Sequence, residues 1–415
     1  MIEHGYTRTS VITRLRRGPL GPHLDALAAT LHQHGYAPDS IRRTLRAGEQ
    51  FGRWLAQHSY AIVDVDEALV TRYLRTLPRP PAGRWPKAAA GLPHLLRLWR
   101  QQDLLPPPSG LPVQTEATLW LGRYAQYLEH VCGTAPSTRT AYLRSVTRLL
   151  AALFGAGRVQ WHTVSAQVLT DFVRQEAATK HGGGRQLPSV AVRSFLRFLV
   201  FSGELPPGLE AAVPLPRHWI HAPLPSRLTG EEVERVLALC IGGGPTALRN
   251  HAILLLLARL GVRAHEVAAL CLDDINWYEG QVRIRPGKTH RERVLPLVQE
   301  VGSAVATYLQ QGRPRPSSRH LFLYCRAPLH PLTDATAISR IATRALRRAG
   351  ITSSARLGAH TFRHTAASQM VNQGASFKDV ADVLGHRSLQ TTGIYAKLDL
   401  TALAAVALPW MGEPV

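Results

Sequence analysis

The sequence predicts a mainly α-helical protein with a small antiparallel β-sheet, an α+β fold. Three observations predict it: apolar residues recur at helical spacing along most of the chain, two proline-rich stretches interrupt that pattern, and three short β-like runs cluster in one region. The chain has 415 residues, 45% of them hydrophobic, which is enough for two or three domains.

The two proline-rich stretches, residues 104–112 and 211–227, mark the expected domain boundaries. Proline lacks the backbone N–H and the free φ angle that regular structure needs. We therefore expect an N-terminal helical module at 1–110, a second helical module at 113–212, a mixed domain at 227–400 and a C-terminal tail at 401–415.

The two helical modules contain an internal repeat. Ala37-Pro38 matches Ala135-Pro136 at an offset of 98, and LLRLW at 95–99 matches FLRFL at 195–199 at an offset of 100. Each copy predicts a long helix, a shorter helix and a last helix: 40–57, 65–77 and 88–102 in the first copy, and 137–154, 164–175 and 190–201 in the second. The repeat predicts a duplicated module, and a chance alignment of amphipathic helices is the alternative.

The region after residue 227 carries different signals. Thr229 and Glu232 have capping-box spacing, which predicts a helix start. A helix is expected at 250–260 and ends at Gly261, and a shorter one follows at 264–270. Three short strands are expected at 274–277, 281–285 and 292–297, with Lys288 at the second turn, and the chain after 335 is again mainly helical.

The charge of the chain indicates a polyanionic partner. Lys and Arg number 49 against 28 Asp and Glu, a net charge of +21, and both halves of the chain are basic. Phosphate neutralisation gives such a protein sequence-independent affinity for nucleic acid. The alternative is compositional drift, since only five of the 49 basic residues are Lys, as a GC-rich genome would favour.

Several other classes of protein are set aside by the sequence. The four cysteines stand far apart, and no apolar run resembles a signal peptide or a membrane span, so we expect a protein of the reducing cytoplasm with no membrane partner. GKT at 287–289 has Val282 where a nucleotide-binding loop needs Gly. His360 and His364 have Thr361 where a zinc protease needs Glu. Asp273-Asp274 is interpreted as a solvated pair, so no cofactor and no metal is expected.

Four local motifs remain: GVRAHEVAAL around Arg263, PGKTHRERVLPL around Lys288, HTFRHT from His360, and LGHRSLQTTGIY ending at Tyr395. Together they resemble the tyrosine recombinase family, the phage-type integrases. The resemblance implies a SAM-like core-binding module followed by a DNA breaking-rejoining catalytic domain. It implies a site-specific DNA recombinase that acts in integration, excision or other mobile-element recombination, as a homo- or hetero-tetramer on two double-stranded DNA sites. A cytoplasmic, nucleoid-associated bacterial protein is the expected setting.

The residue types suit that chemistry. Two guanidiniums can clamp a phosphodiester, a role for Arg263 and Arg363. The resemblance makes Tyr395 the nucleophile that forms a 3′-phosphotyrosine. His360 would help to take its proton. Lys288 is the candidate general acid, although the neighbouring Arg291 and Arg293 are also basic. His386 would donate a hydrogen bond to a non-bridging oxygen, and His364 would support Arg363.

Two other functions stay open at this point. A type IB topoisomerase shares the tyrosine and arginine chemistry but religates the same strand, and a catalytically silent DNA-binding regulator would keep only the binding. The N-terminal module departs from the family pattern, so residues 1–110 could contact flanking DNA or dock another protein. The apolar segment 398–410 could pack on a neighbouring protomer or on its own domain.

Overall fold

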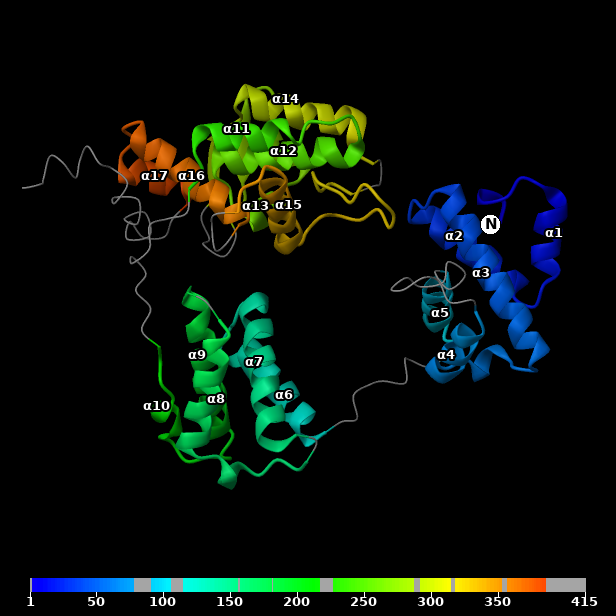
Figure 1. Cartoon of the computed structure of the whole chain (residues 1–415), viewed down its shortest axis with the longest axis horizontal. Coiled ribbons are helices and arrows are strands. Elements are labelled where there is room, and N and C mark those ends of the chain that lie inside the picture. The colour runs from blue at the N-terminus through cyan, green and yellow to red at the C-terminus, as the bar shows by residue number, and fades with distance from the viewer. Residues whose placement is uncertain are drawn as a thin grey trace, which may run out of the picture. The chain divides into compact units, whose positions relative to one another are not determined.

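The computed structural model describes most of the chain (Figure 1). The described residues are 2–77, 91–105, 115–155, 157–180, 182–216, 227–286, 292–314, 318–352 and 357–385. Lys288, Arg291, His386, Tyr395 and the segment 398–410 lie outside them. By contact, the chain divides into two compact units, one of Met1–Leu105 with Leu224–Val415 and the other of Pro106–Pro223.

The N-terminal segment is helical in its described parts. Its α-helices are α1 (Thr9–Arg17), α2 (Gly21–Gln33), α3 (Pro38–Gln57), α4 (Glu67–Thr76) and α5 (Leu92–Gln101). α3 begins with Pro38 at its first position, where the missing N–H costs no helical hydrogen bond. Phe51 and Trp99 are buried at the centre of this segment. The structure confirms the three expected helices here, and α1 and α2 were not among our expectations.

The unit at 106–223 is also helical. It contains α6 (Glu116–Gln126), α7 (Pro136–Phe154), α8 (Ala166–Ala178), α9 (Leu187–Phe201) and α10 (Leu209–Ala212). α7 packs against α9, and an aromatic core lies between the helices. The buried Tyr124 hydroxyl donates to Ser194 Oγ at 2.9 Å, so its polar end keeps a partner. The three helices expected in this module are confirmed.

The two helical segments share an order of caps and buried positions. Ala37 and Ala135 are both extended N-caps followed by proline, and Asp66 and Ser165 both accept a backbone N–H at the start of the next helix. Leu95 and Phe195 are buried alike, as are Trp99 and Leu199. The duplication of one module stays a prediction, and this shared order supports it.

The C-terminal segment combines helices with a small sheet. Its helices are α11 (Gly230–Ala238), α12 (Pro245–Leu260), α13 (Ala264–Ala269), α14 (Gln299–Thr307), α15 (Ala335–Arg348), α16 (Ala359–Asn372) and α17 (Phe377–Leu384). The strands are β1 (Ile275–Asn276), β2 (Gln281–Ile284) and β3 (Arg293–Pro296), paired antiparallel in that order. α12 is buried almost all round and packs against α11, α14 and α16 (Figure 1). The expected helices and strands are present, although α12 begins at Pro245, five residues before its expected start.

Local sequence explains where these elements begin. Thr229 Oγ1 accepts the N–H of Glu232, and the Thr229 N–H donates to the Glu232 carboxylate, so the expected capping box is present. In β2, buried Val282 and Ile284 alternate with exposed Gln281 and Arg283, as in a strand with one face on a core. The described strands are shorter than our expected ranges by one residue at most of their ends.

The described residues form a separate apolar cluster in each of the three segments, at 2–105, 117–213 and 228–362, with a small fourth cluster at 367–384. The division into three domains stays a prediction that these clusters support. No helix in the described part of the chain is both long and apolar enough to cross a membrane.

Candidate active site

Arg263 lies at the junction between two helices. α12 ends at Gly261, whose left-handed φ of +60° is a conformation that favours glycine. The chain then turns, and Arg263 becomes the N-cap of α13. A Cβ at position 261 would lie 2.8 Å from Leu384 Cδ2, so the junction also packs closely against the end of α17. This turn holds Arg263 at the surface of the core with its side chain mostly covered.

A buried carboxylate, Glu266, holds Arg263. It accepts the Arg263 N–H at 2.8 Å and Arg263 Nη1 at 2.9 Å, and it accepts both terminal nitrogens of Arg293 at 3.0 and 2.8 Å. Burial by itself would raise the pKa of the Glu266 carboxyl, but the hydrogen bonds and charges of Arg293 and Arg263 outweigh it and lower the pKa to about 2. Glu266 is therefore an anion that orients two guanidiniums.

Arg363 comes from the first turns of α16 and is buried, with 5% of its surface exposed. Its Nη1 donates to Gly261 O at 2.7 Å, and its Nη2 donates to Leu384 O at 2.7 Å. These carbonyls belong to the ends of α12 and α17. Helix C-termini carry partial negative charge, which favours a guanidinium there.

Three arginines from three elements meet at the end of α17. Arg293 Nε donates to Val383 O at 2.8 Å, Arg363 Nη2 to Leu384 O, and Arg263 Nη2 to Gly385 O at 2.9 Å. Gly385 has φ +64°, and a Cβ there would lie 2.8 Å from Arg293 Nη1. The structure thus brings Arg263 and Arg363 together, as the sequence predicted, and it fixes the backbone directly before His386.

His360 and His364 lie one turn apart on α16, with ring centroids 6.5 Å apart. The pKa of His360 is lowered by burial and by the positive charges of Arg363, Arg263 and His265. His360 is itself exposed to solvent, and the three neighbouring positive charges disfavour a further charge on its ring. Burial, with the charges of His360 and Arg363, lowers the pKa of His364 to about 4. Both rings are therefore neutral at pH 7 and can accept a proton.

Sequence reasoning missed the pair Glu266 and Arg293. Glu266 stands three residues after Arg263 inside the motif GVRAHEVAAL, and that spacing at a helix start was the available signal. Arg293 was considered only as an alternative to Lys288. The interpretation of Asp273-Asp274 as solvated is wrong for Asp274, which is buried and accepts Arg285 Nε at 2.7 Å, whereas Asp273 is exposed.

Comparison with known proteins identifies the family. Residues 226–401 match the family model described as Phage integrase family, and residues 121–203 match the one described as Phage integrase, N-terminal SAM-like domain. The protein y4rA of Sinorhizobium fredii, provisionally named an integrase/recombinase, is 35% identical over 410 residues, which cover 97% of each chain. This chain belongs to the phage integrase family of tyrosine recombinases. Tyrosine recombinases are DNA strand-transferring enzymes, so the chain is an enzyme of that kind.

Other relatives support the same family. The tyrosine recombinase XerC of Yersinia pestis is 29% identical over 294 residues, which cover 68% of this chain and 91% of XerC. Among solved structures, a lambda integrase (75–356) dimer bound to a COC′ core site has a TM-score of 0.54 at 18% identity, covering 72% of this chain and 99% of that one. XerH bound to palindromic difH has a TM-score of 0.53 at 19% identity, covering 72% and 98%. The two structures confirm the fold of the recombinase, a helical SAM-like domain followed by an α+β catalytic domain.

The comparisons also mark off the N-terminal segment. Both family models begin at or after residue 121, whereas the match to y4rA spans nearly the whole of both chains.

In the described parts of the recombinase, no three His, Cys, Asp or Glu side chains are grouped as a metal ion would require.

Proposed function

We propose that this site-specific recombinase cleaves and rejoins DNA through a 3′-phosphotyrosine formed on Tyr395. One observation carries the proposal: Arg263 and Arg363, from different elements, donate to the adjacent carbonyls of Gly385 and Leu384. The two guanidiniums thus meet at one point, next in the chain to His386. Such convergence suits a clamp for one phosphodiester.

The electrostatics of the site support a phosphate ligand. Arg263, Arg293 and Arg363 bring three positive charges, and Glu266 balances one of them. The guanidiniums are already oriented by the protein, so little ordering is needed when the negative charge on phosphorus oxygens rises in the transition state. A guanidinium also keeps its proton, which suits a clamp better than an acid.

The proposed reaction conserves the energy of the phosphodiester bond. Tyr395 Oη attacks phosphorus, and its proton passes to a base, for which the neutral His360 is suited by its lowered pKa. The bond from phosphorus to the 5′ oxygen breaks, and Lys288 donates a proton to that oxygen. His386 donates a hydrogen bond to a non-bridging oxygen. The free 5′ hydroxyl of a partner duplex then attacks the phosphotyrosine and releases Tyr395.

The partners of the reaction follow from this chemistry. Strand exchange needs two duplexes, and we propose four protomers on two specific DNA sites, in integration, excision or mobile-element recombination inside the bacterial cytoplasm. A lambda integrase tetramer has been solved on a Holliday junction, with a TM-score of 0.52 to this chain. The transesterification conserves bond energy, so it needs no ATP, and in the proposed clamp the arginines supply the positive charge that a metal ion would otherwise bring.

A covalent-adduct experiment tests the nucleophile. The full-length recombinase is incubated with duplexes from candidate element ends, denatured with detergent and analysed for DNA-linked protein. Tyr395→Phe should abolish the adduct and leave DNA binding unchanged, because it removes one oxygen and no charge. Tyr278→Phe is the matched control, because Tyr278 is 95% exposed and carries no proposed role. Adducts of Tyr395→Phe at wild-type level would overturn the proposal.

The same preparation separates the two alternative functions. A wild-type protein that forms adducts and relaxes supercoiled DNA, but never exchanges strands between two duplexes, would be a topoisomerase. DNA binding with no adduct from the wild-type protein would identify a regulator. Transfer of a labelled strand to the partner duplex is the result expected of a recombinase.

A further inference from the structure

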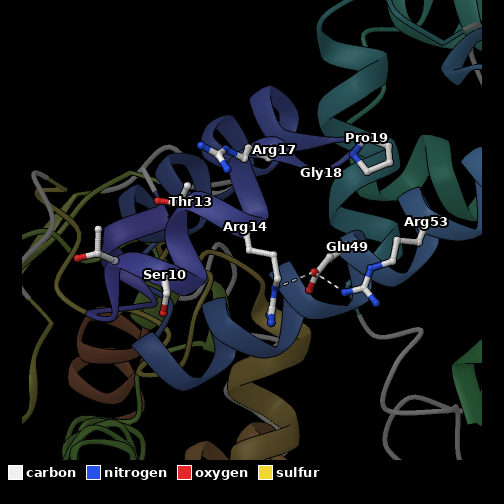
Figure 2. Close-up of a pocket in the computed structure, with 9 residues that line it drawn as sticks. Ser10, Thr13, Arg14, Arg17, Gly18, Pro19, Glu49 and Arg53 are labelled. Carbon is white, nitrogen blue, oxygen red and sulfur yellow. Dashed lines mark hydrogen bonds and ion pairs between the residues drawn. The ribbon is translucent and has the colours of Figure 1, made fainter.

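The N-terminal segment contains a hollow that the proposed function does not use. Its volume is about 850 Å³, and it lies between α1 and α3 (Figure 2). Ser10, Thr13, Arg14 and Arg17 of α1 line it, together with Glu49 and Arg53 of α3. We call it the α1–α3 hollow. Hydroxyl, carboxylate and guanidinium groups are carried by most of the side chains that line it.

The sequence of α1 explains why these side chains share one face. Residues 10, 13, 14 and 17 follow the i, i+3, i+4, i+7 spacing of a single helical stripe. Ile12 and Leu15 are buried on the other side and attach the helix to its core. The stripe runs about 10 Å along the helix axis, a length over which one DNA strand presents about three phosphates.

Glu49 orients two of the arginines. Its carboxylate is buried, with 9% of its side chain exposed, and it pairs with Arg14 Nε at 3.4 Å and with Arg53. Figure 2 shows both guanidiniums pointing toward Glu49. The two side chains remain 62% and 55% exposed, and each guanidinium has five N–H donors, so both keep donors for a ligand.

Arg17 adds a charge that is not neutralised within the hollow. It is exposed, and no hydrogen bond or ion pair to it is present among the residues that the structure describes. The hollow therefore holds three guanidiniums against one carboxylate, a surplus of two positive charges. The hydroxyls of Ser10 and Thr13, on the same stripe of α1, are further donors that line the hollow. This combination of fixed cations and hydroxyls suits phosphate oxygens.

The second helical module lacks these residues. At the offset of 98 that relates Ala37 to Ala135, the counterparts of Glu49 and Arg53 are Thr147 and Ala151. The hollow is thus not a general feature of the repeated helices, and it lies before the part of the chain that the family models match.

We propose that the α1–α3 hollow binds the sugar–phosphate backbone of duplex DNA. The inference rests on the proposed function, because it adds a contact to the duplex on which the recombinase acts. Arg14, Arg17 and Arg53 neutralise phosphates, and the hydroxyls of α1 donate to their oxygens. Such contacts position a protein on DNA and carry no base specificity.

A salt series tests the hollow. Full-length wild type and the double variant Arg14→Ala/Arg17→Ala are titrated into a fluorescein-labelled duplex of arbitrary sequence. Both changed side chains are exposed, and Glu49 keeps its ion pair with Arg53. The variant should therefore have the melting temperature of the wild type. The slope of log affinity against log salt should fall by up to about 1.8, about 0.9 for each lost phosphate contact.

The matched control is Arg75→Ala/Arg97→Ala, which removes the same charge from exposed positions of α4 and α5 outside the hollow. The slope of log affinity against log salt for this control should change by less than half of the change expected for Arg14→Ala/Arg17→Ala. Equal changes in both variants would overturn the inference, because net charge alone would explain them. A wild-type slope in the Arg14→Ala/Arg17→Ala variant would also overturn it, and would favour protein docking.

The adduct assay distinguishes this inference from the proposed function. At saturating protein, Arg14→Ala/Arg17→Ala should still form the Tyr395 adduct, because none of the proposed catalytic residues lines the hollow. A wild-type protein that binds DNA but forms no adduct would overturn the proposed function and leave the salt result for the hollow intact.

Discussion

The guanidinium of Arg293 makes all of its described contacts within the protein. It donates two hydrogen bonds to Glu266 and one to Val383 O, and 9% of its side chain is exposed. A buried, ion-paired guanidinium holds its protons tightly, so Arg293 is poorly suited to be the general acid. We infer that it positions Glu266, which in turn positions Arg263.

Arg293→Ala should destabilise the recombinase. The change removes one partner of a buried ion pair and leaves the Glu266 charge partly uncompensated, which costs about 3–5 kcal/mol in the free energy of unfolding. The control Arg340→Ala breaks an exposed pair with Asp334 and should cost about 0–1 kcal/mol. Urea unfolding of both variants measures the difference. Equal losses would contradict the role given to Arg293.

The role of Lys288 can be separated from binding by changing the leaving group. Lys288→Ala should lose cleavage on ordinary DNA, because the 5′ oxygen then leaves without its proton. A substrate with a 5′-bridging phosphorothiolate should be cleaved again, because sulfur leaves as an anion more easily. The measurement is adduct formation on the two substrates. Equal loss on both would assign Lys288 to binding or folding, and Arg291 would become the candidate acid.

At the scale of elements, the turn after α17 connects the arginines to His386. The carbonyls of residues 383, 384 and 385 each accept from a different arginine, so the backbone of this turn is held from three sides. Ser376 caps the start of α17 and accepts the Asp379 N–H, and Gly385 caps its end. Both ends of this short helix are therefore held by defined hydrogen bonds.

Gly385→Ala should impair catalysis more than stability. Alanine at φ +64° costs about 1–2 kcal/mol, and its Cβ would lie 2.8 Å from Arg293 Nη1, so the arginine cluster must shift. Gly374→Ala is the matched control, because Gly374 has φ +88° and no atom near the added Cβ. We expect similar melting temperatures for the two variants and a loss of adduct rate of at least about 10-fold for Gly385→Ala only. Matching adduct rates would show that the turn does not position the site.

At the scale of the whole molecule, Glu266 should make the free energy of unfolding depend on pH in the acid range. Its pKa in the folded protein is about 2, against 4.5 for an ordinary glutamate. A carboxyl whose pKa is lowered by folding stabilises the folded protein at every pH above its pKa in the unfolded chain. This contribution to the free energy of unfolding, roughly 3 kcal/mol, is lost as the pH falls from 4.5 toward 2. Melting curves of wild type and Glu266→Gln should differ at pH 7 and converge in acid. A gap that stays constant with pH would contradict this linkage.

Short-range signals in the chain were enough to predict the local structure and the family of this recombinase. Proline at the first turn of α3 and α7, the Thr229–Glu232 capping box and Gly261 each act within a few residues, so helix starts and ends could be predicted. The short β-like run at 281–285 likewise predicted the strand β2. The four motifs identified the family, and the clamp chemistry that they imply predicted that Arg263 and Arg363 share one site.

The pairing of the charged side chains could be learned only from the packed molecule. Arg293 reaches Glu266 across 27 residues, Arg363 reaches Gly261 across 102, and Arg263 reaches Gly385 across 122. No local signal encodes such distances, because they depend on how α12, α16 and α17 pack. For the same reason the sequence could not predict the α1–α3 hollow. Glu49 lies 35 positions along the chain from Arg14, and the two meet only because α1 folds back beside α3.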